Sequence, residues 1–345
     1  MLKRNFSTTH NIRIGILSNL PVIPSRGENS DFVADLEVEE QVDAVERVLR
    51  NLGFNFKSFL LGDNIEEVIK ALKAYDVDVV INLCESAFGD SHLEMDVPAM
   101  LELLRVPYTG SPPLTLGLCQ DKGLAKRILS AAGISTPKYQ ILHRYKDWQG
   151  GIDYPLFVKP LSEDASLGIT KESFVRDDVE LKKRVEYIIK YYRQPALVEE
   201  YIDGRELNIA VLGNEEPLVL PISEIIFKFN GEPKIVDYSA KWIKDNENYK
   251  RTIPECPADL KTQVKEVVER AALYSYKALH CRDYARVDIR LKGETPYVLE
   301  ANPNPDLSSD AGFARSLKAE GITFEEFIER IITFALKRRS PLSLF

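Results

Sequence analysis

Short apolar segments alternate with amphipathic segments over the first 84 residues of the chain. The apolar segments are predicted to form strands at 12–18, 55–61 and 78–84, and the amphipathic ones helices at 37–54 and 65–75. Strands that alternate with helices form a parallel sheet covered by those helices. Loops beyond the carboxyl ends of parallel strands line the ligand crevice, so we expect the loops after Ser18 and Cys84 to contribute to a site.

A segment dense in turn-forming residues, YTGSPPLTLG, interrupts this pattern at 108–117. A helix is predicted next, at 120–133, and then a region richer in strands, one of them at 168–172. The last third has further strands, a long helix near 258–280 and a final helix near 322–338. A chain of 345 residues is expected to have two or three domains. The predicted division is 1–111, 112–199 and 200–338, with a tail at 339–345.

The composition excludes several classes of protein. The chain has 45 Lys and Arg against 53 Asp and Glu, a net charge of −8, which disfavours nucleic-acid binding. No apolar run reaches the ~18 residues of a membrane span, and the first residues have no apolar signal-peptide core. The four cysteines show no zinc or disulfide pattern, and motifs of dinucleotide-binding folds, P-loop proteins, serine hydrolases and zincins are missing. We expect a cytoplasmic protein with no nucleic-acid or membrane partner.

Two strands near the C-terminus carry alternating polar residues, in RVDIRLKGETPYVLEANPNP at 286–305. Arg286 and Asp288 share one face of the first strand, and Glu300 and Asn302 share one face of the second. A hairpin would bring two carboxylates and a carboxamide together, an oxygen-only set that suits Mg²⁺, with an arginine for phosphate oxygens. The same pattern is also compatible with a solvated hairpin face that has an internal ion pair.

Three other segments can contribute to a nucleotide site. In FVKPLSEDASLGITKE, at 157–172, an apolar strand presents Lys159 before a loop of small residues, whose backbone N–H groups can approach phosphates. In ALVEEYIDGREL, at 196–207, a strand runs into acids that can bind ribose hydroxyls. Lys122 begins a helix after the turn-rich segment. Taken singly, these are also compatible with an ordinary hairpin, an acidic loop and a surface lysine.

In their order along the chain, these segments resemble the ATP-grasp superfamily, and within it the D-alanine–D-alanine ligase-like family. The resemblance covers about residues 80–335 and rests on PYTGSPPLTLGLCQDKGLAKRILSAAGISTP, LFVKPLSEDASLGI, LVEEYIDGREL, DYSAKW and RVDIRL…YVLEANPNPDLS. It implies an α/β fold, with α+β character in the ATP-binding part. The family has three domains and grips ATP between the central and C-terminal ones.

The resemblance also implies roles for individual residues. Lys122 and Lys159 would contact ATP phosphates, and Ser166, in a loop closed by Gly168, would cover them. The adenine and ribose residues would be Glu199, Glu200, Ile202 and Glu206. Lys241 would lie on a loop that closes over the γ-phosphate, and Arg286 would stabilise the transferred phosphoryl group. Two Mg²⁺ ions, or Mn²⁺ in their place, would be held by Asp288, Glu300 and Asn302.

The implied reaction is an ADP-forming ligation. A substrate carboxylate attacks the γ-phosphate of ATP, and an amine then attacks the resulting acyl phosphate. The protein stabilises spreading charge, orients the two substrates and excludes water. The partners would be a small carboxylate and a small amine, and the resemblance also leads us to expect a homodimer.

The segments that bind substrate in this family differ here. The glutamate-bearing Gly-Gly-x-Ser-x-Glu-type motif after the first strand is missing, and the family's His-Gly pair is replaced by Cys84-Glu85. Asp306 stands where the family has a glycine whose N–H faces the reacting oxyanion. Asp164 replaces the first glycine of the family's phosphate loop, and Trp242 replaces the tyrosine that follows the loop lysine. We therefore predict substrates other than two D-alanines. The alternatives are a genuine D-alanine–D-alanine ligase of peptidoglycan synthesis and a nucleotide-binding protein without ligase activity.

The segment after the third predicted strand is rich in acids: Glu85, Asp90, Glu94 and Asp96. Two interpretations remain open. The acids are compatible with a cationic group on one substrate, and equally with helix caps and surface carboxylates.

Overall fold

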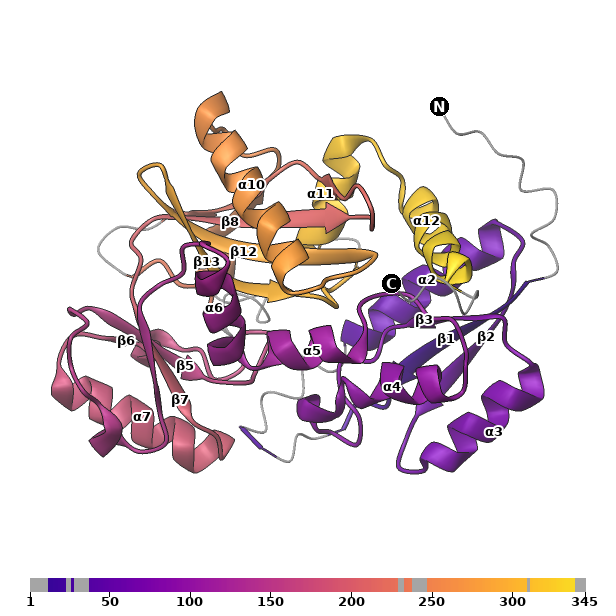
Figure 1. The fold of residues 1–345 in the computed structure, drawn as a ribbon, viewed down its shortest axis with the longest axis horizontal. Helices are drawn as coiled ribbons and strands as arrows, with labels where there is room; N and C mark the ends of the chain where they lie inside the picture. Colours follow the sequence, from indigo (N-terminus) through magenta and orange to yellow (C-terminus); the bar gives the residue numbers. More distant parts are fainter. Residues whose placement is uncertain are drawn as a thin grey trace.

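The computed structural model describes residues 12–22, 26–27, 37–228, 233–237, 247–308 and 311–338. These residues form three β-sheets and the helices that pack on them (Figure 1). The first sheet has the order β2-β1-β3, from strands Asn55–Leu61, Arg13–Asn19 and Val79–Asn82. Both pairings are parallel, which confirms the prediction for this part of the chain. Its helices are α2 (Glu37–Asn51), α3 (Ile65–Tyr75) and α4 (Asp96–Leu103).

The second sheet is antiparallel and has the order β4-β7-β5-β6. Its strands are Tyr139–Leu142, Ala196–Glu200, Leu156–Pro160 and Phe174–Val175. Helix α7 (Asp178–Tyr192) packs its apolar side on this sheet. Its N-cap residue is Asp177, whose side chain accepts hydrogen bonds from two backbone N–H groups of the first turn. The helix predicted at 120–133 is α6 (Lys122–Ala131), and an unpredicted helix, α5 (Pro113–Gln120), begins within the turn-rich segment 108–117. Asp121 separates them because its side chain caps α6 through Leu124 N.

The strand predicted at 168–172 is wrong. Residues 171–173 form a 3₁₀ turn, and the short strand β6 follows them. The backbone N–H of Thr170 donates to Ser173 Oγ at 3.2 Å, and this local capping competes with strand pairing.

The third sheet contains six strands, in the order β11-β10-β8-β12-β13 with β9 paired to β8. The strands are β8 (Arg205–Leu212), β9 (Leu218–Val219), β10 (Ser223–Phe227), β11 (Thr252–Glu255), β12 (Tyr284–Lys292) and β13 (Thr295–Asn302). Helix α10 (Thr262–Ala278) covers one face, and the short helix α9 (Glu247–Lys250) precedes β11. The predicted hairpin is confirmed: β12 and β13 are antiparallel, and Gly293, with φ +61°, lies in their turn.

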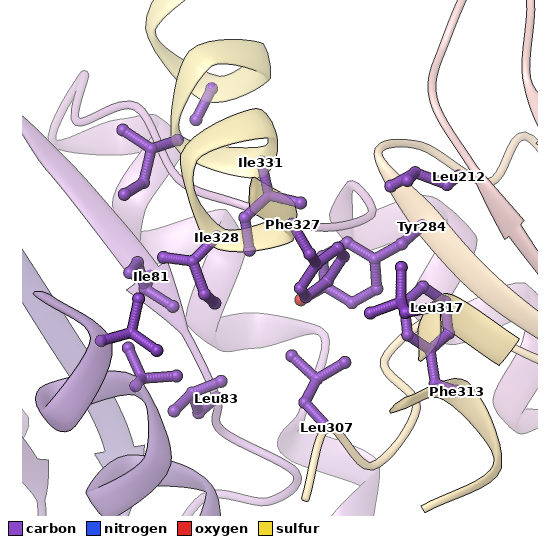
Figure 2. Close-up of a cluster of buried hydrophobic side chains, with 14 of the residues drawn as sticks. Ile81, Leu83, Leu212, Tyr284, Leu307, Phe313, Leu317, Phe327, Ile328 and Ile331 are labelled. Carbon is purple, nitrogen blue, oxygen red and sulfur yellow. The ribbon is translucent and has the colours of Figure 1, made fainter. Parts of the chain in front are cut away.

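The end of the chain returns to its beginning. Helix α11 (Gly312–Glu320) was not predicted, and α12 (Phe324–Lys337) follows it. Figure 2 shows Ile328 and Ile331 of α12 beside Ile81 and Leu83 from β3 and its loop, with Tyr284 of β12 in the same core. One hydrophobic core therefore joins the first and third sheets. The predicted limits 1–111, 112–199 and 200–338 stay a prediction. Helix α12, in the third of these regions, shares a hydrophobic core with the first region.

Candidate functional site

A cavity of about 350 Å³ lies between the second and third sheets. Its lining includes eleven of the residues predicted to form the site: Lys159, Ser166, Glu199, Glu200, Ile202, Glu206, Arg286, Asp288, Glu300, Asn302 and Asp306. Lys122 is not part of the lining but lies 3.8 Å from the lining residue Glu300, and Gly168 is outside the lining, in the loop that contains Ser166. Lys241, and with it Trp242, lies outside the described residues.

The polar faces of β12 and β13 meet as the hairpin prediction requires. Asp288 is the direct neighbour of Glu300 across the two strands, and Arg286 is that of Asn302. Two nitrogens of Arg286 lie 2.8 and 2.9 Å from the two oxygens of Asp288. Asn302 Nδ2 donates to the same carboxylate at 3.3 Å. The strand pairing thus gathers one cation, two carboxylates and an amide on one wall of the cavity.

This set fits a hard divalent cation. All its ligand atoms would be oxygens, and two carboxylates leave coordination positions for phosphate oxygens and water, as Mg²⁺ prefers. Among the described residues there is no group of three or more His, Cys, Asp and Glu suited to a metal, so no competing site of that kind appears there. Asp288, Glu300 and Asn302 are therefore the candidate metal ligands.

Positive charge surrounds Glu300. Lys159 Nζ lies 3.3 Å and Lys122 Nζ 3.8 Å from its Oε2 atom. Burial alone would raise the pKa of Glu300, but these two lysines and Arg286 outweigh it and lower the pKa to about 2. Burial likewise opposes the charge of Arg286, yet Asp288 and Glu300 raise its pKa above the ordinary value. Both groups are therefore charged at neutral pH.

The loop between β5 and β6 approaches the cavity with an unusual backbone. Ala165, Ser166 and Gly168 all have positive φ, at 53°, 60° and 69°. A Cβ atom on Gly168 would lie 2.7 Å from Pro160 Cγ and 2.9 Å from Tyr192 Cζ, so this position requires glycine. Ser166 Oγ donates to the carbonyl of Val236 at 3.2 Å, which ties the loop to the segment 233–237.

Lys122 already has partners within this loop. Its Nζ atom lies 2.6 Å from Asp164 Oδ1 and 2.6 Å from the carbonyl oxygen of Glu163. Burial lowers the pKa of Lys122, but Asp164 and Glu300 outweigh this effect and raise it above the ordinary value. The aspartate that replaces a family glycine thus pairs with a predicted phosphate-binding lysine.

The end of the cavity predicted for adenine and ribose is built by β7, β8 and the turn between them. Glu199 and Glu200 end β7, and Ile202 is buried in the turn. Glu206 lies on β8, and Arg290 Nη2 lies 2.5 Å from its carboxylate. Burial raises the pKa of Glu206, and Arg290 opposes the shift.

Three residues at or beside the site were not among the predicted set. Asn208 donates to Asp288 Oδ1 at 2.7 Å, and its position two residues after Glu206 on β8 is the only signal that could have suggested it. Arg290 alternates with Arg286 and Asp288 on β12, but only the fold places it against Glu206. Lys126 is buried behind the cavity against Glu199.

The acids after β3 divide between the two interpretations. Asp90 caps the 3₁₀ turn at Ser91–Leu93 and pairs with Arg26, which is a structural role. Glu85 accepts a hydrogen bond from Gln41 Nε2 at 2.8 Å, and Glu94 accepts one from Asn304 Nδ2 at 3.0 Å. Asn304 also donates to the carbonyl of Cys84 at 2.9 Å. Glu94 therefore contacts the segment that follows Asn302 directly, whereas Glu85 is linked to it through Gln41, whose Oε1 accepts from Leu307 N at 3.2 Å.

Asp306 lies in the same segment and lines the cavity. Its carboxylate accepts hydrogen bonds from Ser308, from the backbone N at 2.7 Å and from Oγ at 3.0 Å. These bonds keep the side chain within its own turn.

Comparison with known proteins agrees with this arrangement. The family model described as "D-ala D-ala ligase C-terminus" matches residues 128–333. An uncharacterised protein of Sinorhizobium fredii, y4sG, is 36% identical over 75% of each chain. The D-alanine–D-alanine ligase of Carboxydothermus hydrogenoformans is 31% identical over 86% of this chain and 93% of its own. The crystal structure of the D-alanine–D-alanine ligase of Bacillus anthracis complexed with ATP superposes with a TM-score of 0.74 at 27% identity, covering 95% of this chain and 98% of that one.

Across the described residues, no helix is long and apolar enough to cross a membrane. The sheets, the cavity between the second and third of them, and the match of the family model over most of the chain agree with one another. The chain belongs to the D-alanine–D-alanine ligase-like family of ATP-grasp proteins.

Proposed function

We propose that this protein joins the carboxylate of an amino acid or similar small acid to an amine, with release of ADP and phosphate, and that its two substrates are not both D-alanine. One observation carries the proposal. Lys159 from the second sheet and Arg286, Asp288, Glu300 and Asn302 from the third line a single cavity. A protein that only binds a nucleotide does not need a full set of groups for phosphoryl transfer, so this set disfavours the non-catalytic alternative.

The proposed roles follow from charge and position. Lys122, Lys159 and Lys241 neutralise ATP phosphates, and Arg286 stabilises the phosphoryl group as the substrate carboxylate attacks it. Asp288, Glu300 and Asn302 hold Mg²⁺, which when bound supplies further positive charge to the phosphate oxygens. The amine then attacks the carbonyl carbon of the acyl phosphate, the C–N bond forms and phosphate leaves.

The remaining residues orient and enclose the nucleotide. Glu199, Glu200 and Ile202 surround the base, and Glu206 accepts ribose hydroxyls. Ser166 and the loop closed by Gly168 cover the phosphates, which keeps water from the acyl phosphate. Asp306 supplies its backbone N–H near the reacting carbonyl.

The residues that follow β3 support substrates other than two D-alanines. Cys84-Glu85 replaces the family's His-Gly pair. Glu94 contacts Asn304, in the segment that contains Asp306, and Glu85 is linked to the same segment through Gln41. Burial, followed by nearby Asp164 and Glu85, raises the pKa of Glu94 well above its usual value, against the hydrogen bond from Asn304. A cationic group on one substrate would compensate these carboxylates. A genuine D-alanine–D-alanine ligase is the second candidate, because curated relatives carry that name.

The test measures ADP release from ATP and Mg²⁺ with a panel of D- and L-amino acids, diamines and dipeptides, and identifies each product by mass. We expect ADP and a C–N bonded product with a pair other than two D-alanines, including one partner with an additional cationic group. D-Alanyl-D-alanine as the main product would establish the second candidate. ATP binding without ADP release from any pair would favour a protein that only binds the nucleotide. Gel filtration with light scattering tests the predicted homodimer.

A further inference from the structure

An alternating row of buried charges runs through the wall behind the cavity. Lys126 Nζ lies 2.8 Å from Glu199 Oε1, and Lys159 Nζ lies 3.7 Å from Glu199 Oε2. Lys159 Nζ lies 3.3 Å from Glu300 Oε2, and Lys122 Nζ lies 3.8 Å from the same oxygen. Each carboxylate therefore lies between two lysines. Four members of this row were predicted as site residues, and Lys126 was not.

Lys126 has no direct access to a ligand in the cavity. Its side chain is 1% exposed and is absent from the cavity lining, whereas Glu199 and Lys159 are part of that lining. It lies one helical turn after Lys122 on α6, so both lysines project from one face toward the same wall. Its remaining contacts are Thr136 Oγ1, at 2.8 Å, and the ring of Tyr139.

The partner of Lys126 is a buried carboxylate, that of Glu199. Its side chain is 3% exposed, and a carboxylate so deeply buried requires paired positive charge. Lys126 is the nearer of its two lysines. Without Lys126, the charge of Glu199 would be left to Lys159, which would be drawn toward Glu199 and away from Glu300.

We propose that Lys126 is a positioning residue for ATP. By pairing with Glu199, it leaves Lys159 directed toward Glu300 and the phosphate end of the cavity. The inference rests on the proposed function only in that Lys159 is taken to bind phosphates. Lys126 itself contacts no substrate.

The test measures equilibrium binding of ATP and of adenosine by calorimetry, without ligation substrates, for Lys126→Met, Glu199→Gln and the double variant. We expect Lys126→Met to weaken ATP binding about tenfold, the scale of coupling between contacting charges, and to change adenosine binding less than twofold. In the double variant Glu199 no longer carries a charge that could draw Lys159 away from Glu300. Its affinity for ATP is therefore expected to equal that of Glu199→Gln alone. Arg127→Met, on the exposed side of the same helix, is the matched control and should bind ATP as the wild type does.

Two outcomes would overturn the proposal. Equal losses of ATP and adenosine affinity in Lys126→Met would show that Lys126 acts on the base end through Glu199 and not on Lys159. A double variant that binds ATP tenfold more weakly than Glu199→Gln would show that Lys126 acts independently of Glu199. The second comparison remains available if Lys126→Met alone fails to fold. Both outcomes are measured by binding without turnover. They can therefore be interpreted even if the proposed ligation reaction is wrong.

Discussion

Lys159 Nζ of β5 lies 3.3 Å from Glu300 Oε2 of β13, although 141 residues separate the two in the chain. The ion pair joins the second sheet to the third at the cavity between them. It combines a group suited to phosphate with a group suited to a divalent cation. The site is therefore defined at the contact between two sheets and not within either one.

The substitution Glu300→Gln is predicted to abolish ligation while leaving the protein folded. It removes a charge from the candidate metal set and the partner of two lysines, and loss of one such electrostatic group costs about 10²- to 10³-fold in kcat. Steady-state ADP release measures the loss, and titration with Mn²⁺ checks whether cation affinity falls with it. Glu294→Gln, in the exposed turn of the same hairpin, is the control. A Glu300→Gln enzyme with a near-normal rate would exclude the metal assignment.

The substitution Gly168→Ala is predicted to disturb the loop between β5 and β6, which is proposed to cover the phosphates. The added methyl group meets Pro160 and Tyr192 at a φ of +69°, which we expect to cost about 1–3 kcal/mol and to weaken ATP binding. Chemical denaturation and ATP titration measure the two effects. Gly150→Ala is a matched control, because Gly150 has a φ of +70° with no atom within 4 Å of the added Cβ. Equal effects of the two substitutions would assign the cost to φ alone.

The buried carboxyl group of Glu163 is predicted to make stability fall as pH rises. Its pKa is raised to about 7, chiefly by burial, against hydrogen bonding from Gln194 and the charge of Lys122. A group whose pKa is higher in the folded state stabilises fully below its unfolded pKa, near 4.5, and this contribution is lost as pH rises through about 7. The shift corresponds to roughly 3 kcal/mol.

The substitution Glu163→Gln removes this titration. We expect urea denaturation to show a smaller decrease in the free energy of unfolding between pH 4.5 and pH 8 than in the wild type. The neutral amide keeps a carbonyl oxygen for Gln194 or Ser91, whose contacts with Glu163 are 2.7 and 3.4 Å. An unchanged pH dependence would show that Glu163 does not titrate in this range.

The core shared by the first and third sheets is predicted to be sensitive to truncation. Ile331 on α12 is fully buried there, and Ile331→Ala is expected to lower the free energy of unfolding by about 2–5 kcal/mol (Figure 2). Leu103→Ala is the control, because Leu103 is 86% exposed. Thermal and urea denaturation measure both variants. A loss below 1 kcal/mol in Ile331→Ala would mean that α12 does not stabilise the contact between the sheets.

The local part of this structure could be predicted from the sequence because its signals have short range. Alternating apolar strands and amphipathic helices indicate a covered parallel sheet, and period-2 alternation places Arg286 with Asp288 and Glu300 with Asn302 on one face. The strand expected at 168–172 was wrong because Ser173 Oγ accepts from Thr170 N and caps a 3₁₀ turn, which takes the place of strand pairing.

By itself, the sequence determined the strand–helix order of the first 84 residues, the hairpin that carries four polar residues and the family to which the chain belongs. Tertiary structure alone decided which distant charges meet. Nothing in the sequence singled out Lys126, yet it is buried against Glu199, 73 residues later in the chain. It also decided that α12 packs on the first sheet. The physical reason is that a buried ion pair or core contact depends on the surfaces that approach one another, and local periodicity contains no information about that approach.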